Sequence, residues 1–344
     1  SMLRRWSISP TRPDGVPAAT RTESTTPLAC APELRAAAVS ALGTLGDRRA
    51  VLPLIHYGIE HPHSKYLTYD AILKIGDKCV LELLDVLNSR EPGVVLEAVV
   101  LLGRLRDAKA IPVLVQVIET RSALFRAHAA EALGQIGDRK CLNTLLPLLK
   151  DENIGVRTNA AAALGKMPDA HAVEPLVAAL ADEDADVRLH AIQTLGEIGD
   201  ARAATALCRI LTSGSVDHQL AAADALGQCG DTRAVPLLLE RIQSDDEMIQ
   251  LRAISALRRL KDPRAIEALT GLLHHPSDPI RQRVVDTLGR IGDAEVAARL
   301  EEVLKHDRSE LVRVAAAKSL GDIGDPGSID ALLDALDDEF PVKC

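Results

Sequence analysis

One ten-residue motif recurs along this chain and sets the spacing of everything else. Residues 129–138, AAEALGQIGD, return in recognisable form in ten copies, and each copy closes on an aspartate. The closing aspartates are Asp47, Asp77, Asp107, Asp138, Asp169, Asp200, Asp231, Asp262, Asp293 and Asp325. They lie 30 to 32 residues apart. A period of this length predicts one solenoid, in which each unit packs on its neighbours, rather than two or three globular domains.

The composition indicates which secondary structure fills the repeat. Hydrophobic residues make up 47% of the chain, yet it contains only one Trp, three Tyr and two Phe. We therefore expect a core of Ala, Leu, Ile and Val, which suits closely spaced helices better than packed β-sheets. The sequence predicts an all-α fold, an α-solenoid of about ten two-helix repeats.

Each repeat is predicted to contain two helices. Apolar residues follow each Gly-Asp pair at helical spacing. In one unit these residues are Ala172, Val173, Leu176, Val177 and Leu180. An acidic link then leads to a second helix over residues 187–198. Asp200 is placed to cap the following helix with its carboxylate, and Gly199 to end the preceding one.

Two glycine positions in the motif carry separate expectations. The glycine four residues before the closing aspartate is best explained by close approach of neighbouring helices. Leu73 and Arg258 replace it in units two and eight, so we expect looser junctions there. The glycine directly before the aspartate is replaced by Arg106, Pro168 and Lys261. Proline cannot adopt positive φ, so either this position does not require a left-handed residue or unit five closes differently.

A basic residue lies twelve positions before the closing aspartate in seven of the ten units. These residues are Arg35, Lys65, Arg126, Arg157, Arg188, Arg281 and Arg313. Since every unit also carries an Asp, the simplest arrangement is a ladder of ion pairs between neighbouring repeats. Exposed pairs contribute about 0 to 1 kcal/mol each, against about 1.5 to 3 kcal/mol for a buried Leu or Ile. The ladder would therefore set the register, and the aliphatic residues would hold the fold.

The two ends of the chain depart from the repeat. Residues 1–32 contain five prolines and many Ser and Thr, so we expect a disordered or loosely docked tail there. The repeat array is expected over residues 33–344, beginning with a second helix whose first-helix partner is not recognisable in the sequence. Residues 337–343 match the link that precedes a second helix elsewhere. We therefore expect the array to be cut within a further repeat.

The repeat has a recognisable pattern, D-x-x-V-R-x-x-A-A-x-A-L-G-x-I-G-D, which residues 184–200 show with minor departures. It resembles the short HEAT repeats of the phycobilisome-lyase type, and the resemblance covers about residues 33–343. It implies a right-handed α-solenoid, with second helices on the concave face and first helices on the convex face. Such repeats occur in bilin lyases, in assembly and degradation factors and in deoxyhypusine hydroxylases, so the resemblance leaves the function open.

By that resemblance, the polar side of each second helix lines a concave groove, which is where we look for function. The candidate groove residues are His128, Glu131, Gln135, His190, Gln193 and Asp224. Variation along these positions fits a surface shaped to one partner, and it also fits a face that is merely solvated.

A basic patch in units eight and nine is the first feature that stands out. It consists of Arg252, Arg258, Arg259, Arg283 and Arg290, in a chain of net charge −9. An acidic or phosphorylated segment of a protein partner could bind there. The alternative is a solvated face that neighbouring acidic residues partly neutralise.

The second feature is a group of aromatic and histidine side chains near one link. It consists of Tyr57, Tyr66, Tyr69 and His63. Clustered aromatics are typical of contact spots, although at least one of these tyrosines could instead fill the core. We expect no metal site here, because Pro62 breaks the helical spacing that two histidine ligands would need.

The sequence lacks the functional residues of the enzyme classes that the resemblance suggests. Deoxyhypusine hydroxylases carry His-Glu dyads on second helices, but the matching pairs include Ala127-His128 and Leu189-His190, with no dyad among them. His128 and His190 lie two repeats apart, about 20 Å, too far to share one metal. A bilin lyase would need aromatic and polar groups that this groove mostly lacks. We predict no catalytic residues and no cofactor.

The remaining composition limits partners and location. A net charge of −9 disfavours binding to nucleic acid or to anionic membranes, and no apolar run approaches the length of a membrane span. Six scattered cysteines without metal spacing indicate a reducing compartment, the cytoplasm. We predict a non-enzymatic scaffold that binds a protein partner along its concave groove. The alternative is a bilin lyase or chromophore-handling chaperone.

Overall fold

A computed structural model describes residues 32–337, and within them the secondary structure is entirely helical. The second helices of the repeats are α1 (Pro32–Leu45), α3 (Lys65–Ile75), α5 (Pro92–Leu105), α7 (Ala123–Ile136), α9 (Ile154–Gly165), α11 (Ala185–Ile198), α13 (Val216–Cys229), α15 (Glu247–Leu260), α17 (Asp278–Ile291) and α19 (Glu310–Ile323). The first helices are α2 (Val51–Glu60), α4 (Val80–Val86), α6 (Ile111–Thr120), α8 (Leu142–Leu148), α10 (Val173–Ala179), α12 (Ala204–Ser213), α14 (Val235–Arg241), α16 (Ile266–Thr270), α18 (Ala294–His306) and α20 (Ile329–Asp334).

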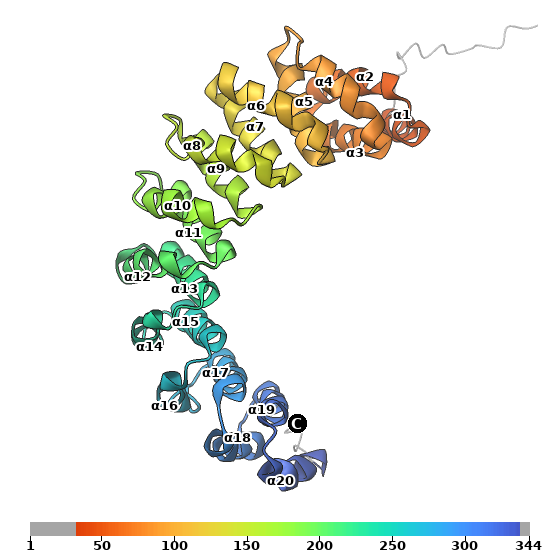
Figure 1. Ribbon diagram of the computed structural model, residues 1–344. Coiled ribbons are helices and arrows are strands. Elements are labelled where there is room, and N and C mark those ends of the chain that lie inside the picture. The colour runs from red at the N-terminus through yellow and green to blue at the C-terminus, as the bar shows by residue number, and fades with distance from the viewer. Residues whose placement is uncertain (1–31, 338–344) are drawn as a thin grey trace, which may run out of the picture.

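The helices stack into a curved two-layer array. Figure 1 shows the odd-numbered helices on the inner side of the arc and the even-numbered helices on the outer side. The predicted α-solenoid is therefore confirmed, with second helices lining its concave face. The expected tail lies outside the described residues apart from Pro32, which begins α1. The expected cut repeat after residue 337 also lies outside them.

The core is aliphatic and continuous along the array. The residue five places before each closing aspartate is the clearest example, because Leu133, Leu164 and Leu195 are each 0% exposed. Each such side chain contributes about 1.5–3 kcal/mol by its removal from water. Alanines lie among these residues, and Tyr69 and Phe125 are the aromatic side chains buried in the described core. The two helix layers therefore pack mainly through small aliphatic side chains.

Glycine allows successive second helices to pack closely. A β-carbon added to Gly134 would lie 2.7 Å from the Cα of Ala163 and 2.6 Å from its Cβ, well inside van der Waals contact. Gly103 meets Ala132 in the same way, and Gly227 meets Ala256. The close approach predicted for this glycine is therefore confirmed.

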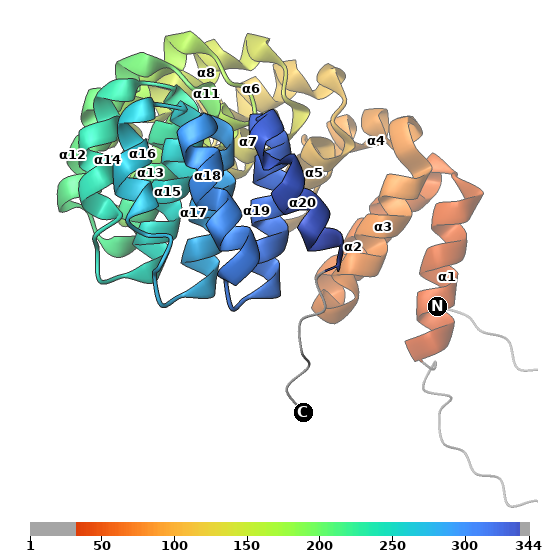
Figure 2. The ribbon, with the colours of Figure 1, turned by 90° about the horizontal axis from the view of Figure 1, so that it is seen from below.

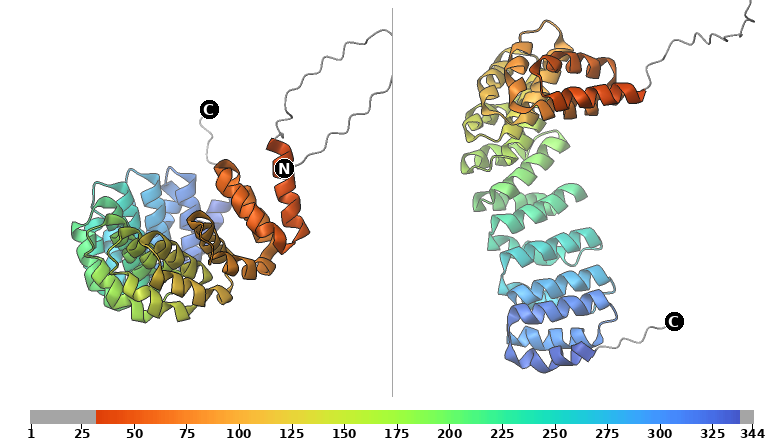
Figure 3. Two further views of the ribbon diagram at one scale, coloured as in Figure 1. Left: turned by 90° about the horizontal axis from the view of Figure 1, so that it is seen from above. Right: turned by 90° about the vertical axis from the view of Figure 1, so that its right-hand side faces the viewer.

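The stacking is interrupted between α3 and α5. Leu73 stands in place of the close-contact glycine, and these two helices share far fewer contacts than any other successive second helices. Gly76 ends α3 with φ 73° and ψ −144°, a conformation that L side chains rarely adopt. Figures 2 and 3 show α1 and α3 standing apart from the helices that follow. At the other predicted site, Arg258, α15 and α17 are loosened to a smaller extent.

The Gly-Asp turns behave as predicted for a cap. In nine units the closing aspartate accepts a hydrogen bond from the backbone N–H two residues later, as Asp200 does from Arg202 (2.9 Å). The preceding residue is left-handed in most turns, even where it is Arg106 (φ 55°) or Lys261 (φ 52°). Unit five closes differently, because Lys166 ends its helix in right-handed geometry (φ −75°) ahead of Pro168. A left-handed residue is therefore the rule, and proline is accommodated by a different turn.

We expect Lys261→Gly to raise the midpoint of urea unfolding. In the folded state a non-glycine residue at positive φ costs about 1–2 kcal/mol, and glycine removes this cost. Glycine also raises the conformational entropy of the unfolded chain, which offsets part of the gain, so the free energy of unfolding should rise by about 0.5–1 kcal/mol. The matched control is Lys166→Gly, at a right-handed helix end, which should instead lower the midpoint. Equal shifts of the same sign in both variants would contradict this account of the turn.

Candidate partner-binding surface

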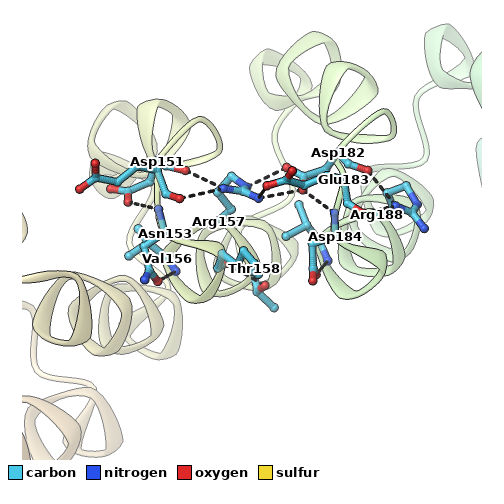
Figure 4. Close-up of polar contacts among 12 residues, drawn as sticks. Asp151, Asn153, Val156, Arg157, Thr158, Asp182, Glu183, Asp184 and Arg188 are labelled. Atoms are coloured by element: carbon cyan, nitrogen blue, oxygen red, sulfur yellow. Dashed lines mark hydrogen bonds and ion pairs between the residues drawn. The ribbon is translucent and has the colours of Figure 1, made fainter.

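Arginines at the start of the second helices form a ladder along one edge of the array. In three units the guanidinium binds a carboxylate in the link of the next repeat rather than the closing aspartate of its own repeat. Figure 4 shows one of these pairs, Arg157 with Asp182. The pairs are Arg126–Asp151 (2.8 Å), Arg157–Asp182 (3.0 Å) and Arg281–Asp307 (2.8 Å). The predicted ion-pair ladder is confirmed for these units, and its arginines are engaged in holding neighbouring repeats together.

The ladder carboxylates are electrostatically stabilised. Burial by itself would raise the pKa of Asp151, Asp182 and Asp307, but hydrogen bonds from the paired arginine and from a backbone N–H outweigh it. The net result is a lowered pKa at all three aspartates. Their contribution to stability is therefore fully present above the unfolded-state pKa of about 3.9 and is lost as the pH falls through the lowered folded-state pKa.

We expect the midpoint of urea unfolding to fall as the pH is lowered from 5 to 3, because the unfolded chain then binds more protons than the folded one. Asp182→Asn removes one titrating group of the ladder, so its midpoint should be lower at pH 7 and should fall less on acidification. A variant that kept the full acid dependence would show that Asp182 does not contribute to it.

The predicted groove residues lie on three inner helices. His128, Glu131 and Gln135 share α7, where Gln135 donates a hydrogen bond to Glu131 (3.0 Å). His190 and Gln193 share α11, two repeats from α7, and the Nδ1 atom of His190 lies 2.8 Å from the carbonyl of its own helix at Asp186. Within residues 32–337 no three His, Cys, Asp or Glu side chains gather as metal ligands would.

The basic patch divides into a paired and an unpaired part. Arg252, on α15, forms an ion pair with Asp224 on α13 (2.7 Å), so its charge is already neutralised. Arg258, Arg259, Arg283 and Arg290 form no ion pair with any described carboxylate. Lys318 on α19 also lacks one. We call these five unpaired side chains, Arg258, Arg259, Arg283, Arg290 and Lys318, the basic surface.

The carboxylate of Asp286 lies among the cations of the basic surface. Burial raises its pKa, while Arg258, Arg283, Lys318 and Arg290 act to lower it, so these four cations lie near one carboxylate. Four cations around one acid, with Arg259 next to Arg258 on α15, leave an excess of positive charge on three successive inner helices. Sequence reasoning missed Lys318 because it lies one repeat beyond the arginines. The repeat register could have found it, since Lys318 and Asp286 occupy equivalent positions seven before the closing aspartate.

The aromatic and histidine group is only partly exposed. Tyr66 is 69% exposed and His63 is also on the surface, whereas Tyr57 is half-buried and stacks on His61 with ring centroids 4.3 Å apart. Tyr69 is 8% exposed and lies under Arg104, whose guanidinium is 4.6 Å from the ring centre. Tyr69 is therefore buried, which is the alternative that the sequence left open for at least one of these tyrosines.

Tyr69 instead fills the gap between α3 and α5. Its hydroxyl donates to Glu97, which also accepts from Lys65 (2.6 Å). Burial, together with the adjacent Glu97 carboxylate, raises the pKa of Tyr69, so its hydroxyl stays protonated as a donor. This polar cluster occupies the space that direct helix contact fills at the other junctions.

Comparison with known families identifies the repeat. A HEAT repeat model matches residues 80–153, 142–218, 207–284 and 270–342, and a PBS lyase HEAT-like repeat model matches residues 34–57. Because the first model covers more than half of the chain, this protein belongs to the HEAT-repeat family. Repeats of this family generally mediate protein–protein interaction. None of the helices within residues 32–337 is long and apolar enough to cross a bilayer.

Solved structures share the fold. An engineered protein matches with TM-score 0.57 and 23% identity, over 87% of this chain and 92% of that chain. The YibA protein of Escherichia coli matches with TM-score 0.53 and 21% identity, over 75% of this chain and 96% of that chain. The CpcE–CpcF complex of phycocyanin lyase from Nostoc matches with 25% identity over 66% of this chain and 92% of that chain, but its TM-score of 0.41 supports no argument. No curated protein matches the chain.

Proposed function

We propose that this chain is a non-enzymatic scaffold of the cytoplasm that binds a protein partner along its concave surface, with the basic surface as the main contact. The observation that carries the proposal is that these five cations form no ion pair with a carboxylate of residues 32–337, whereas Arg252 is already paired with Asp224. An unpaired cation can bind an anionic group of another molecule without first breaking an existing pair. The repeat family supports the scaffold role.

The partner that fits this surface presents an acidic or phosphorylated segment. Guanidinium groups bind carboxylate or phosphate oxygens through paired, charge-assisted hydrogen bonds, and four of the five cations are arginines. Towards the N-terminus of the array, the inner helices α13, α11 and α7 carry Asp224, Gln193 and Glu131, which are acidic or neutral polar residues. A partner lying along the arc would thus meet positive charge at one end and mixed polarity at the other.

Charge reversal at exposed positions tests this proposal. The triple variant Arg259→Glu, Arg290→Glu and Lys318→Glu changes only exposed side chains, so the array should keep its stability. Immobilised wild-type protein should retain a partner from a lysate of the source organism, and the variant should retain at least about tenfold less, equivalent to about 1.4 kcal/mol. The captured protein is then identified by mass spectrometry and its affinity measured at low and high salt.

The control has the same change in charge away from the concave face. Arg90→Glu, Arg209→Glu and Lys305→Glu alter exposed residues of a link and of outer helices α12 and α18. This variant should bind the partner as the wild type does. If both variants retained equally little partner, the effect would come from net charge alone. If the first variant retained as much partner as the wild type, the basic surface would not be the contact.

A chromophore-handling role is the second candidate, supported by the PBS lyase HEAT-like match at residues 34–57. This segment holds Tyr57, and Tyr66 follows it on the neighbouring helix. Mixing the protein with a linear tetrapyrrole should then shift the absorption band of the pigment, and Tyr57→Ala with Tyr66→Ala should abolish the shift. An unchanged spectrum would rule against this role.

A further inference from the structure

Helix α1 presents an apolar face that no described residue covers. Leu34 is 62% exposed, Leu42 is 37% exposed and Leu45 is 75% exposed. Ala38 and Ala41 lie exposed on the same helix between these leucines. Spacings of three and four residues place these side chains along one side of the helix, so they form one continuous strip, which we call the α1 face.

The repeat itself shows that the α1 face is built to be covered. At the register position of Leu42, five before the closing aspartate, the other nine second helices carry Leu or Ile that are 0–1% exposed. At the position of Ala38, the other nine residues are also 0–1% exposed. In those helices the covering comes from the first helix of the same repeat and from the preceding second helix. For α1, only α3 is present among the described elements.

We propose that the apolar residues near the start of this chain, Met2, Leu3, Trp6 and Ile8, bind the α1 face in cis. These four residues include the single tryptophan of the chain. The inference concerns the end of the array opposite the basic surface and does not depend on the proposed function.

The length and composition of the preceding segment favour this occupant. Residues 20–27, which align with a first helix by register, read TRTESTTP and offer no apolar stripe to cover α1 in the usual way. Residues 9–31 can span up to about 75 Å when extended, whereas α1 is about 21 Å long, so the first residues can reach every part of the face. A covalent tether also gives them an effective concentration on the order of millimolar, which favours them over a second copy at ordinary concentrations.

Tryptophan fluorescence of the full chain tests the proposal, because all of the signal comes from Trp6. Docking on the α1 face predicts an emission maximum shifted to the blue of that of a free peptide of residues 1–15, and weaker quenching by acrylamide. Leu34→Asp with Leu45→Asp places charges on the face at positions already exposed, so the array should stay folded while the emission returns to that of the peptide.

The matched control is Leu124→Asp with Leu311→Asp, which alters leucines of similar exposure (55% and 66%) on other second helices. Its emission should equal that of the wild type, and circular dichroism should show both variants folded. The proposal is overturned by peptide-like emission in the wild-type chain, or by blue-shifted emission that the α1-face variant leaves unchanged. It is also overturned if the blue shift depends on protein concentration and accompanies dimerisation in light scattering, since the occupant would then be a second copy.

Discussion

Replacing Arg281 by Met is expected to lower the free energy of unfolding by about 3–5 kcal/mol, among the largest effects of any single substitution in the array. The Arg281 side chain is 4% exposed and binds Asp307, itself 7% exposed, across the junction between repeats. Methionine keeps the aliphatic volume but leaves the aspartate buried without its counter-charge. Urea unfolding followed by circular dichroism measures the change.

Two further variants separate the buried pair from ordinary surface charge. Arg308→Met removes an arginine that is 67% exposed and bound to Asp278, so it should change the free energy of unfolding by no more than about 1 kcal/mol. Adding Asp307→Leu to Arg281→Met should recover much of the loss, because no unpaired buried charge is left. If Arg281→Met and Arg308→Met had equal effects, the ladder would not hold the repeats together.

Gly134→Ala should lower the free energy of unfolding by about 2 kcal/mol, even though alanine is the better helix former. The new methyl group would lie 2.7 Å from the Ala163 Cα, and the backbone of the next helix cannot yield as a flexible side chain would. The expected structural response is a local widening between α7 and α9, which hydrogen exchange of their backbone amides would report as faster opening.

Gly321→Ala is the control for this substitution. Gly321 occupies the same register position in α19, but a β-carbon there meets no described atom within 4 Å. Alanine should therefore raise the free energy of unfolding by about 0.5–1 kcal/mol through helix propensity alone. Opposite signs for the same chemical change would establish that packing, and not propensity, fixes glycine in the motif. Destabilisation at both positions would contradict that conclusion.

The repeat architecture was predictable because it rests on local rules. A period in the sequence fixes the number of units, and the small residues within it fix how closely helices approach, so the loosening at Leu73 followed from one substitution. The different turn of unit five was left open, because Pro168 excludes one backbone conformation without selecting another. That Arg106 and Lys261 adopt positive φ could not be read from their chemistry, since the surrounding turn imposes it.

The candidate surface was less predictable because it depends on distances between repeats. The sequence grouped Arg252 with its neighbours, yet a carboxylate 28 residues away neutralises it. The sequence also offered no reason to distinguish the three tyrosines. In the structure, α3 and α5 are separated where Leu73 replaces glycine, and Tyr69 is buried in that space. Pairing and burial of this kind require the relative placement of helices, which periodicity alone does not supply.

The break between α3 and α5 has a mechanical consequence for the whole array. From α5 onward, each inner helix contacts the next along its length, so bending there must deform packed alanine and leucine side chains. Between α3 and α5 the contacts are few, and they include the polar cluster of Lys65, Tyr69, Glu97 and Arg104. A load applied across the ends of the arc would therefore deform this junction before the others, and α1 to α3 would move together relative to the rest of the array.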